Sequence, residues 1–293
     1  GPISLRESRV YCRTFMICPS QSRIGSFMLI LCNGMMRAGS TLQYNWTRML
    51  IQKTCSGEAH GFASTYPGHT SPLTDERFLT WMRDPTRHLV KIHEAHPLIA
   101  ETVGDGSLQI CYIYRDIRDV AASAKHVRTW RGPALTDRLD KAIGYYEELR
   151  SVRDREPSAV LWQRYEDVTA DPHRAVRDIG RFLNVPADDE MVDEIVEETS
   201  IENAQRIAAQ ARDSLNDHLA KLRASDPPAA ASLVAEMQRG NIAWTDPTTH
   251  LNYNHISRYE GASGTWRVVL ADAEAREITE RYSDWLASAG YEL

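Results

Sequence analysis

The sequence lacks the features that mark membrane, fibrous and disordered proteins. Its longest strongly apolar run is residues 27–32 (FMLILC), far below the ~20 residues that a helix needs to cross a bilayer. Gly and Pro number only 16 and 13 in 293 residues, too few for a fibrous or low-complexity chain. We therefore expect a folded protein without a membrane span, long enough for one or two domains.

Cysteine pairs, clustered metal ligands and excess positive charge are missing as well. The five cysteines are an odd number with no CxxC pair, so neither a disulfide framework nor a zinc site is indicated, and a reducing cytoplasm is expected. No carboxylate cluster or histidine pair stands at ligand spacing, so we expect no metal. With 34 Lys+Arg against 40 Asp+Glu, the net charge of -6 argues against a nucleic-acid partner. Any anion site must be local.

From residue 26 onward, short apolar runs alternate with segments of helical period. The expected strands are residues 27–33, 88–92, 108–114 and 158–165. This alternation is typical of βαβ units and predicts an α/β fold, with a central parallel sheet flanked by helices. We expect residues 26–293 to form a single domain with a helical cap insert at about 204–254, and residues 1–25 to be a flexible leader or tag remnant.

Capping residues predict where several helices begin and end. Asp171 followed by Pro172 predicts an N-cap and a first helical residue, and Asp188 stands at the start of another helix with an acidic first turn. A closing helix is expected from about Asp272 to Gly290. In the cap segment, residues 226–228 (DPP) separate two helices.

A glycine-containing loop follows the first strand at residues 34–41 (GMMRAGST), and a helix is expected to begin at Ser40. Such a turn offers backbone N–H groups and the positive end of a helix dipole to an anion, which predicts a phosphate site. Gly34 and Gly39 have the spacing of the two glycines in a Walker loop. However, Ser40 stands where a nucleoside triphosphatase carries Lys, and the cation is Arg37 instead. A P-loop phosphotransferase using ATP and magnesium, or a turn without a ligand, remain alternatives.

Five motifs in collinear order resemble the sulfotransferases that use 3′-phosphoadenosine 5′-phosphosulfate (PAPS), over about residues 27–290. Residues 37–41 (RAGST) resemble that family's 5′-phosphosulfate loop, and residues 112–123 (YIYRDIRDVAAS) its 3′-phosphate motif. Residues 163–167, 199–203 and 255–267 are similar to three further segments. The resemblance implies a P-loop-like nucleotide-binding fold and co-substrate contacts from Arg37, Ala38, Gly39, Ser40, Thr41, Leu42, Arg115, Ser123, Tyr165, Thr199, Arg258 and Gly261. For Thr199, a helix N-cap is the alternative.

Lys91 and His93 stand two residues apart in a predicted strand and therefore point to the same side of it. They match the family's Lys-x-His at the site of transfer, which implies in-line sulfuryl transfer with His93 as general base and PAP (3′,5′-diphosphoadenosine) as product. Lys91 and Arg37 would stabilise the leaving group, and Glu94 is the alternative base. The acceptor would be a hydroxyl, or less readily an amine, of a small molecule, sugar, lipid or carrier-bound chain. The unassigned segments 55–85 and 204–254 are expected to form its pocket.

The match departs from the family near the C-terminus. Aligned on Gly261, the family's Arg and Lys fall on Tyr259 and Glu260, and Arg258 is shifted one residue earlier. This departure leaves a further alternative, a non-catalytic nucleotide-binding or assembly protein. The intact pair of Lys91 and His93 argues against that alternative. Oligomeric state is not determined by the sequence.

Overall fold

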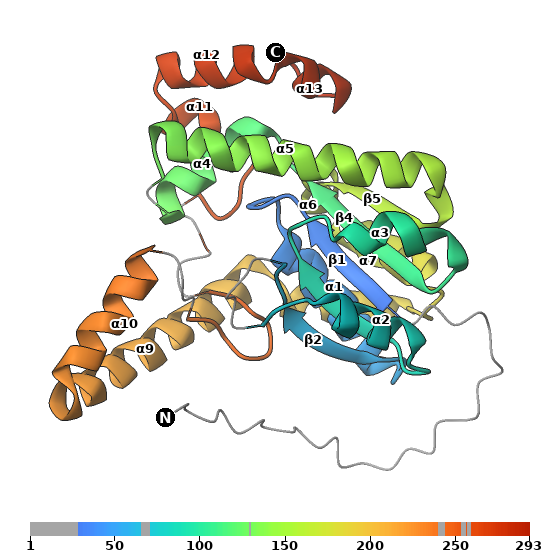
Figure 1. The fold of residues 1–293 in the computed structure, drawn as a ribbon, viewed down its shortest axis with the longest axis horizontal. Coiled ribbons are helices and arrows are strands. Elements are labelled where there is room, and N and C mark those ends of the chain that lie inside the picture. The colour runs from blue at the N-terminus through green and yellow to red at the C-terminus, as the bar shows by residue number, and fades with distance from the viewer. Residues whose placement is uncertain (1–28, 66–70, 129, 240–243, 253–255, 257–258) are drawn as a thin grey trace.

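A computed structural model describes residues 29–65, 71–128, 130–239, 244–252, 256 and 259–293. The expected leader, residues 1–25, lies outside these ranges. In the described chain the sheet has five strands, all parallel, in the order β2-β3-β1-β4-β5 (Figure 1). The strands are β1 (Leu29–Gly34), β2 (Glu58–Phe62), β3 (His88–Ile92), β4 (Leu108–Tyr114) and β5 (Val160–Arg164).

Helices cover both faces of the sheet, which confirms the predicted α/β fold. One face packs against α1 (Ser40–Lys53), α6 (Tyr165–Ala170), α7 (Pro172–Phe182) and α8 (Asp189–Glu198). The other packs against α2 (Asp75–Arg83), α3 (Pro97–Thr102), α4 (Ile117–Arg128), α5 (Gly132–Arg155), α12 (Asp272–Arg281) and α13 (Ser283–Ser288). Short 3₁₀ turns lie at Val103–Asp105 and Pro157–Ala159, and α11 is Trp266–Val269.

The central strand explains the continuous apolar runs in the sequence. Leu29 and Leu31 belong to the core on one face of β1, whereas Ile30 and Cys32 belong to the core on the other. All four side chains are fully buried. A strand covered on both faces reads as an unbroken hydrophobic run rather than an alternating one.

Of the four predicted strands, β3 and β4 have the boundaries expected. The predicted strand 27–33 corresponds to β1, which within the described residues ends one residue later, at Gly34. β2 was not predicted: its sequence EAHGF has little apolar content because it is an edge strand with one exposed end. The predicted strand 158–165 is too long at both ends, since Ser158 lies in a 3₁₀ turn and Tyr165 opens α6. The closing helix is divided into α12 and α13 at Tyr282.

The predicted caps are present. The Asp171 carboxylate accepts a hydrogen bond from the Arg174 N–H at 2.9 Å. The Asp188 carboxylate accepts one from the Met191 N–H, also at 2.9 Å. Each cap satisfies a donor that the first helical turn leaves without an intrahelical partner.

Two helices, α9 (Ile201–Ser225) and α10 (Pro227–Arg239), form a hairpin that extends away from the sheet (Figure 1). The predicted break lies at Asp226, whose carboxylate caps α10 through the Ala229 N–H at 3.0 Å. Across the described residues, every helix is too short or too polar to span a membrane.

Candidate active site

The carboxyl ends of the central strands open into a large cavity of about 1410 Å³. Its wall is formed by the loops after β1, β3 and β4, the start of α9, and the segment 244–252. In open parallel sheets this edge is where ligands bind.

The loop after β1 has the backbone shape of an anion site. Arg37 and Gly39 both have left-handed backbone, with φ of 66° and 82°. At Gly39 a Cβ would lie 2.7 Å from the Tyr165 ring, so only glycine fits. Gly39 is also the N-cap of α1 and offers no side-chain oxygen to the first turn, which contains no acid. The first-turn N–H groups, from Ser40 to Leu42, therefore stand at the cavity wall ready to bind an anion.

Of the six predicted loop contacts, five line the cavity: Arg37, Gly39, Ser40, Thr41 and Leu42. Ala38 is different, because its side chain is fully buried in the core beneath the loop. Its N–H donates to the Met35 carbonyl at 3.0 Å, which holds the loop in its turn.

Two cations reach this loop from different elements. The Lys91 ammonium donates to the Thr41 hydroxyl at 2.9 Å, joining β3 to α1. Burial, together with the nearby charge of Arg37, lowers the pKa of Lys91 to about 8. Arg37 Nε in turn donates to the Ser123 hydroxyl of α4 at 3.0 Å. The predicted phosphosulfate loop and the predicted 3′-phosphate motif are thus in direct contact.

His93 is held in one tautomer by the loop. Its Nδ1 lies 2.8 Å from the Gly34 carbonyl oxygen. A carbonyl can only accept, so Nδ1 carries the hydrogen and the lone pair is on Nε2. Burial, with the charge of Lys91 next in importance, lowers the pKa of His93 to about 3, and the imidazole is neutral at neutral pH.

Glu94, the alternative base, is nearly fully buried and already has donors. One carboxylate oxygen accepts from the Ser64 hydroxyl at 2.7 Å, and the other lies 3.4 Å from the His93 N–H. It also lines the cavity. Its oxygens therefore contact the Ser64 side chain and the His93 backbone, and Glu94 stays the alternative base.

Arg115 lies where β4 ends and meets the C-terminal loop. Its Nη2 donates to the Ala262 carbonyl at 2.7 Å and lies 3.3 Å from that of Gly261. The guanidinium stacks on the Tyr165 ring at 4.2 Å, and the Tyr165 hydroxyl donates to the Gly261 carbonyl at 2.6 Å. Arg115 Nε is buried and has no hydrogen-bond partner among the described residues. A buried cationic donor without an acceptor fits a site built for an anion.

Asp119, expected from the sequence only as a possible ion-pair partner of Arg115, anchors the same loop. Its buried carboxylate accepts from the N–H groups of Gly264 and Trp266, at 2.7 and 2.9 Å, and from the Thr265 hydroxyl at 3.1 Å. It also lies 3.5 Å from Arg115, four residues earlier on the chain. The ion pair is present but buried, and not at the surface as expected.

Two predicted co-substrate contacts remain, Arg258 and Thr199. Arg258 lies outside the described residues. Glu260 accepts from the Gln205 amide at 2.7 Å, which ties the C-terminal loop to α9. Thr199 lines the cavity, and its hydroxyl accepts from the Trp46 indole N–H at 2.8 Å. It ends α8 rather than capping α9, whose N-cap is the neighbouring Ser200.

A second histidine, His250, enters the cavity wall from the predicted cap segment and was not identified from the sequence. It has a left-handed backbone, with φ of 55°, a strained conformation for a residue with a side chain. Its ring packs so closely on Gly61 that a Cβ there would be 2.2 Å away. Burial, then the charge of Lys91, lowers the pKa of His250 to about 4. The unassigned segment 55–85 contributes Phe62 and Ser64 to the same wall.

Together these groups form a cationic cleft beside a neutral imidazole. Such a site can hold a ligand with several negative charges and can take a proton from a hydroxyl placed next to it.

Comparison with known proteins agrees with this geometry. The sequence model of the sulfotransferase domain family matches residues 34–226. Sulfotransferase 1B1 of Canis lupus familiaris is 27% identical over 139 residues, 41% of this chain and 45% of that protein. Sulfotransferase 1A1 of Bos taurus is 27% identical over 135 residues, 42% of this chain and 46% of that protein. The chain therefore spans about half the length of the curated relatives it matches.

Solved structures share the fold at low sequence identity. Mouse sulfotransferase SULT7A1 complexed with PAP has a TM-score of 0.54 at 16% identity, over 88% of this chain and 83% of that chain. Retinol dehydratase in a complex with retinol and PAP has a TM-score of 0.53 at 14% identity, over 91% of this chain and 83% of that chain.

Proposed function

Because the chain belongs to the sulfotransferase domain family, we propose that it transfers the sulfuryl group of PAPS to a hydroxyl of an acceptor and releases PAP. One observation carries the proposal: Arg37, Lys91 and His93 gather around a single anion-binding loop at the carboxyl edge of the sheet. PAP is present in the mouse sulfotransferase and retinol dehydratase structures that share this fold.

In this proposal the phosphosulfate binds the N–H groups at the start of α1 and the guanidinium of Arg37, and the 3′-phosphate binds Arg115 and Ser123. The orphaned Nε of Arg115 supports its assignment to a phosphate group. Tyr165 would contact the adenine, with further contacts from Thr199, Gly261 and Arg258.

The proposed transfer step follows from the charges of these side chains. The acceptor oxygen attacks sulfur as the bond from sulfur to the 5′-phosphate oxygen breaks, and the acceptor proton moves to Nε2 of His93. Lys91 and Arg37 stabilise the negative charge that collects on the departing phosphate oxygen. The low pKa of His93 keeps its lone pair available, and the anionic co-substrate nearby raises that pKa towards a value suited to a base.

We further propose a single domain in which the α9–α10 hairpin and the segment 244–252 cap an acceptor pocket. Part of its wall, including Phe62 and His250, is aromatic, which suits a small hydroxylated organic molecule. Retinol and androsterone are named in two retinol dehydratase structures of this fold. Cys32 and Cys111 are buried free thiols, which supports a reducing cytoplasmic setting.

The test is calorimetric titration with PAP and, separately, with ATP plus magnesium. We expect tight PAP binding and weak ATP binding. In Arg115→Ala the affinity for PAP should fall ~10- to 100-fold, the loss expected for a charged hydrogen-bond donor. Arg174→Ala, an exposed arginine of α7, is the matched control and should bind PAP normally.

Alternative functions predict other outcomes. Binding of ATP with magnesium alone would refute the sulfotransferase proposal in favour of a phosphotransferase. PAP binding without any transfer of labelled sulfate to a panel of hydroxylated acceptors, with His93→Ala indistinguishable from the parent protein, would favour a non-catalytic nucleotide-binding protein.

A further inference from the structure

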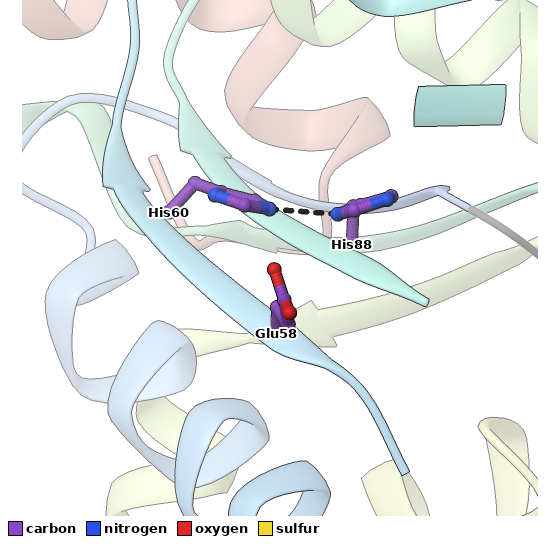
Figure 2. Close-up of side chains that lie close together, drawn as sticks. All are labelled: Glu58, His60 and His88. Carbon is purple, nitrogen blue, oxygen red and sulfur yellow. Dashed lines mark hydrogen bonds between the residues drawn. The ribbon is translucent and has the colours of Figure 1, made fainter. Parts of the chain in front are cut away.

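Two histidines and a glutamate meet at the end of the sheet opposite the transfer site (Figure 2). Glu58 and His60 lie two residues apart on β2 and so share one face of it, and His88 is the register partner of Glu58 on β3. One nitrogen or oxygen atom from each side chain lies within 4.8 Å of the others. The closest approach is 2.7 Å, between His60 Nε2 and His88 Nδ1.

Both histidines are sheltered. His88 is 5% exposed, and the Trp81 ring of α2 stacks on His60 at 4.6 Å. Imidazole is the commonest metal ligand in proteins.

The geometry points to a divalent-metal site: we propose that Glu58, His60 and His88 bind a zinc-like ion through two imidazole nitrogens and one carboxylate oxygen. This donor set is one that zinc takes in proteins, with water completing the tetrahedron. The ion would replace the hydrogen bond between the imidazoles. Two nitrogens on a tetrahedral zinc are ~3.3 Å apart, so a small rotation of either ring suffices.

The second nitrogen of His88 supplies an independent observation. Nε2 is buried and has no hydrogen-bond partner among the described residues, and the Asp84 carboxylate lies 3.6 Å from it. When Nδ1 binds a metal, the proton must be on Nε2, where it needs an acceptor. A carboxylate behind a metal-bound imidazole is the usual support, and Asp84 is positioned to provide it.

The ion would have a structural role. His88 opens β3 and Lys91 lies three residues later, ~10 Å along the strand and on its other face. A metal at His88 therefore cannot reach the transferred group. It would instead join the edge strand β2 to β3, and so fix the wall that carries Phe62 and Lys91.

Zinc binding by the purified full chain, freed of any affinity tag and stripped with chelator, tests the proposal by competition with a chromogenic chelator. We expect one zinc per chain, at least ~10-fold weaker binding in Glu58→Gln, and loss of binding in His60→Ala. His173→Ala, an exposed histidine on α7 that pairs with Asp193, is the control and should bind normally. Cobalt should give the visible absorption of a tetrahedral site in the parent protein and not in His60→Ala.

Thermal unfolding separates a metal effect from a folding defect. Zinc should raise the Tm of the parent protein and of His173→Ala, and leave that of His60→Ala unchanged. A parent protein that binds no zinc, or that binds it as tightly in Glu58→Gln and His60→Ala, would overturn the proposal. PAP binding is measured separately, so failure of the metal site leaves the proposed function untouched, and the reverse holds as well.

Discussion

Raising the pH through 8 should weaken PAP binding, because Lys91 loses its proton in the free protein before it does in the complex. Burial and Arg37 lower the pKa of Lys91 to about 8 in the free site. A bound phosphate group stabilises the ammonium and raises that pKa towards the ordinary value of ~10.4. Between pH 8 and ~10.4 the complex therefore holds more protons than the free protein. The affinity for PAP is highest below pH 8 and falls as the pH rises above it.

The expected size of the effect follows from these two values. Between pH 7.5 and 9.5, the fraction of free protein with a charged Lys91 falls steeply while the complex stays charged, which weakens PAP binding ~20-fold. The phosphates of PAP do not contribute, since their second ionisation near pH ~6 is complete throughout this range.

Calorimetry at pH 7.5, 8.5 and 9.5 measures the effect, and repeating it in buffers of different ionisation enthalpy counts the protons taken up. Lys91→Arg keeps its charge over this range and should bind PAP with little pH dependence. Lys91→Met should bind weakly and equally at all three values. An unchanged affinity in the parent protein, or the same decline in folded Lys91→Arg, would refute the reasoning.

Three further changes test other parts of the site. His93→Ala should lower kcat for sulfate transfer ~10²- to 10⁴-fold while calorimetry shows normal PAP binding, since the lost group acts on the proton and not on the nucleotide. Gly39→Ala should lower the free energy of unfolding in urea by at least ~1–2 kcal/mol, because alanine there has a left-handed backbone and meets an aromatic ring; Gly144→Ala, in open space on α5, should leave stability unchanged or raise it. Asp119→Asn should speed hydrogen exchange at the Trp266 amide and weaken PAP binding ~10-fold, and a loop that stays protected would contradict this role for the carboxylate.

The parts of the site that could be predicted are those whose signal is local. The loop from Gly34 to Ser40 needs glycine and a cation within a few residues, and its helix begins where the sequence indicated. Lys91 and His93 could be assigned to one strand end because they stand two positions apart in the sequence. In both cases the neighbours that decide the structure are close in the sequence.

Other parts depended on contacts that sequence spacing does not reveal. The edge strand β2 carries too few apolar residues to be recognised alone, and it is defined by its pairing with β3. His250 reaches the cavity because the chain returns to the sheet after α10, and its ring packs on Gly61 almost two hundred residues earlier. Glu58 and His88 are separated by a loop and α2, and only their pairing across two strands brings them together.

The sequence by itself therefore determined the class of fold, the anion-binding loop and the residues proposed for transfer, since alternating apolar runs and short motifs act through near neighbours. Only the tertiary structure decided which distant groups meet: Arg37 with Ser123, Arg115 with the loop at Gly261, and His60 with His88. The physical reason is that strand order and register set these distances, and both result from packing the whole sheet between its helices rather than from any one segment.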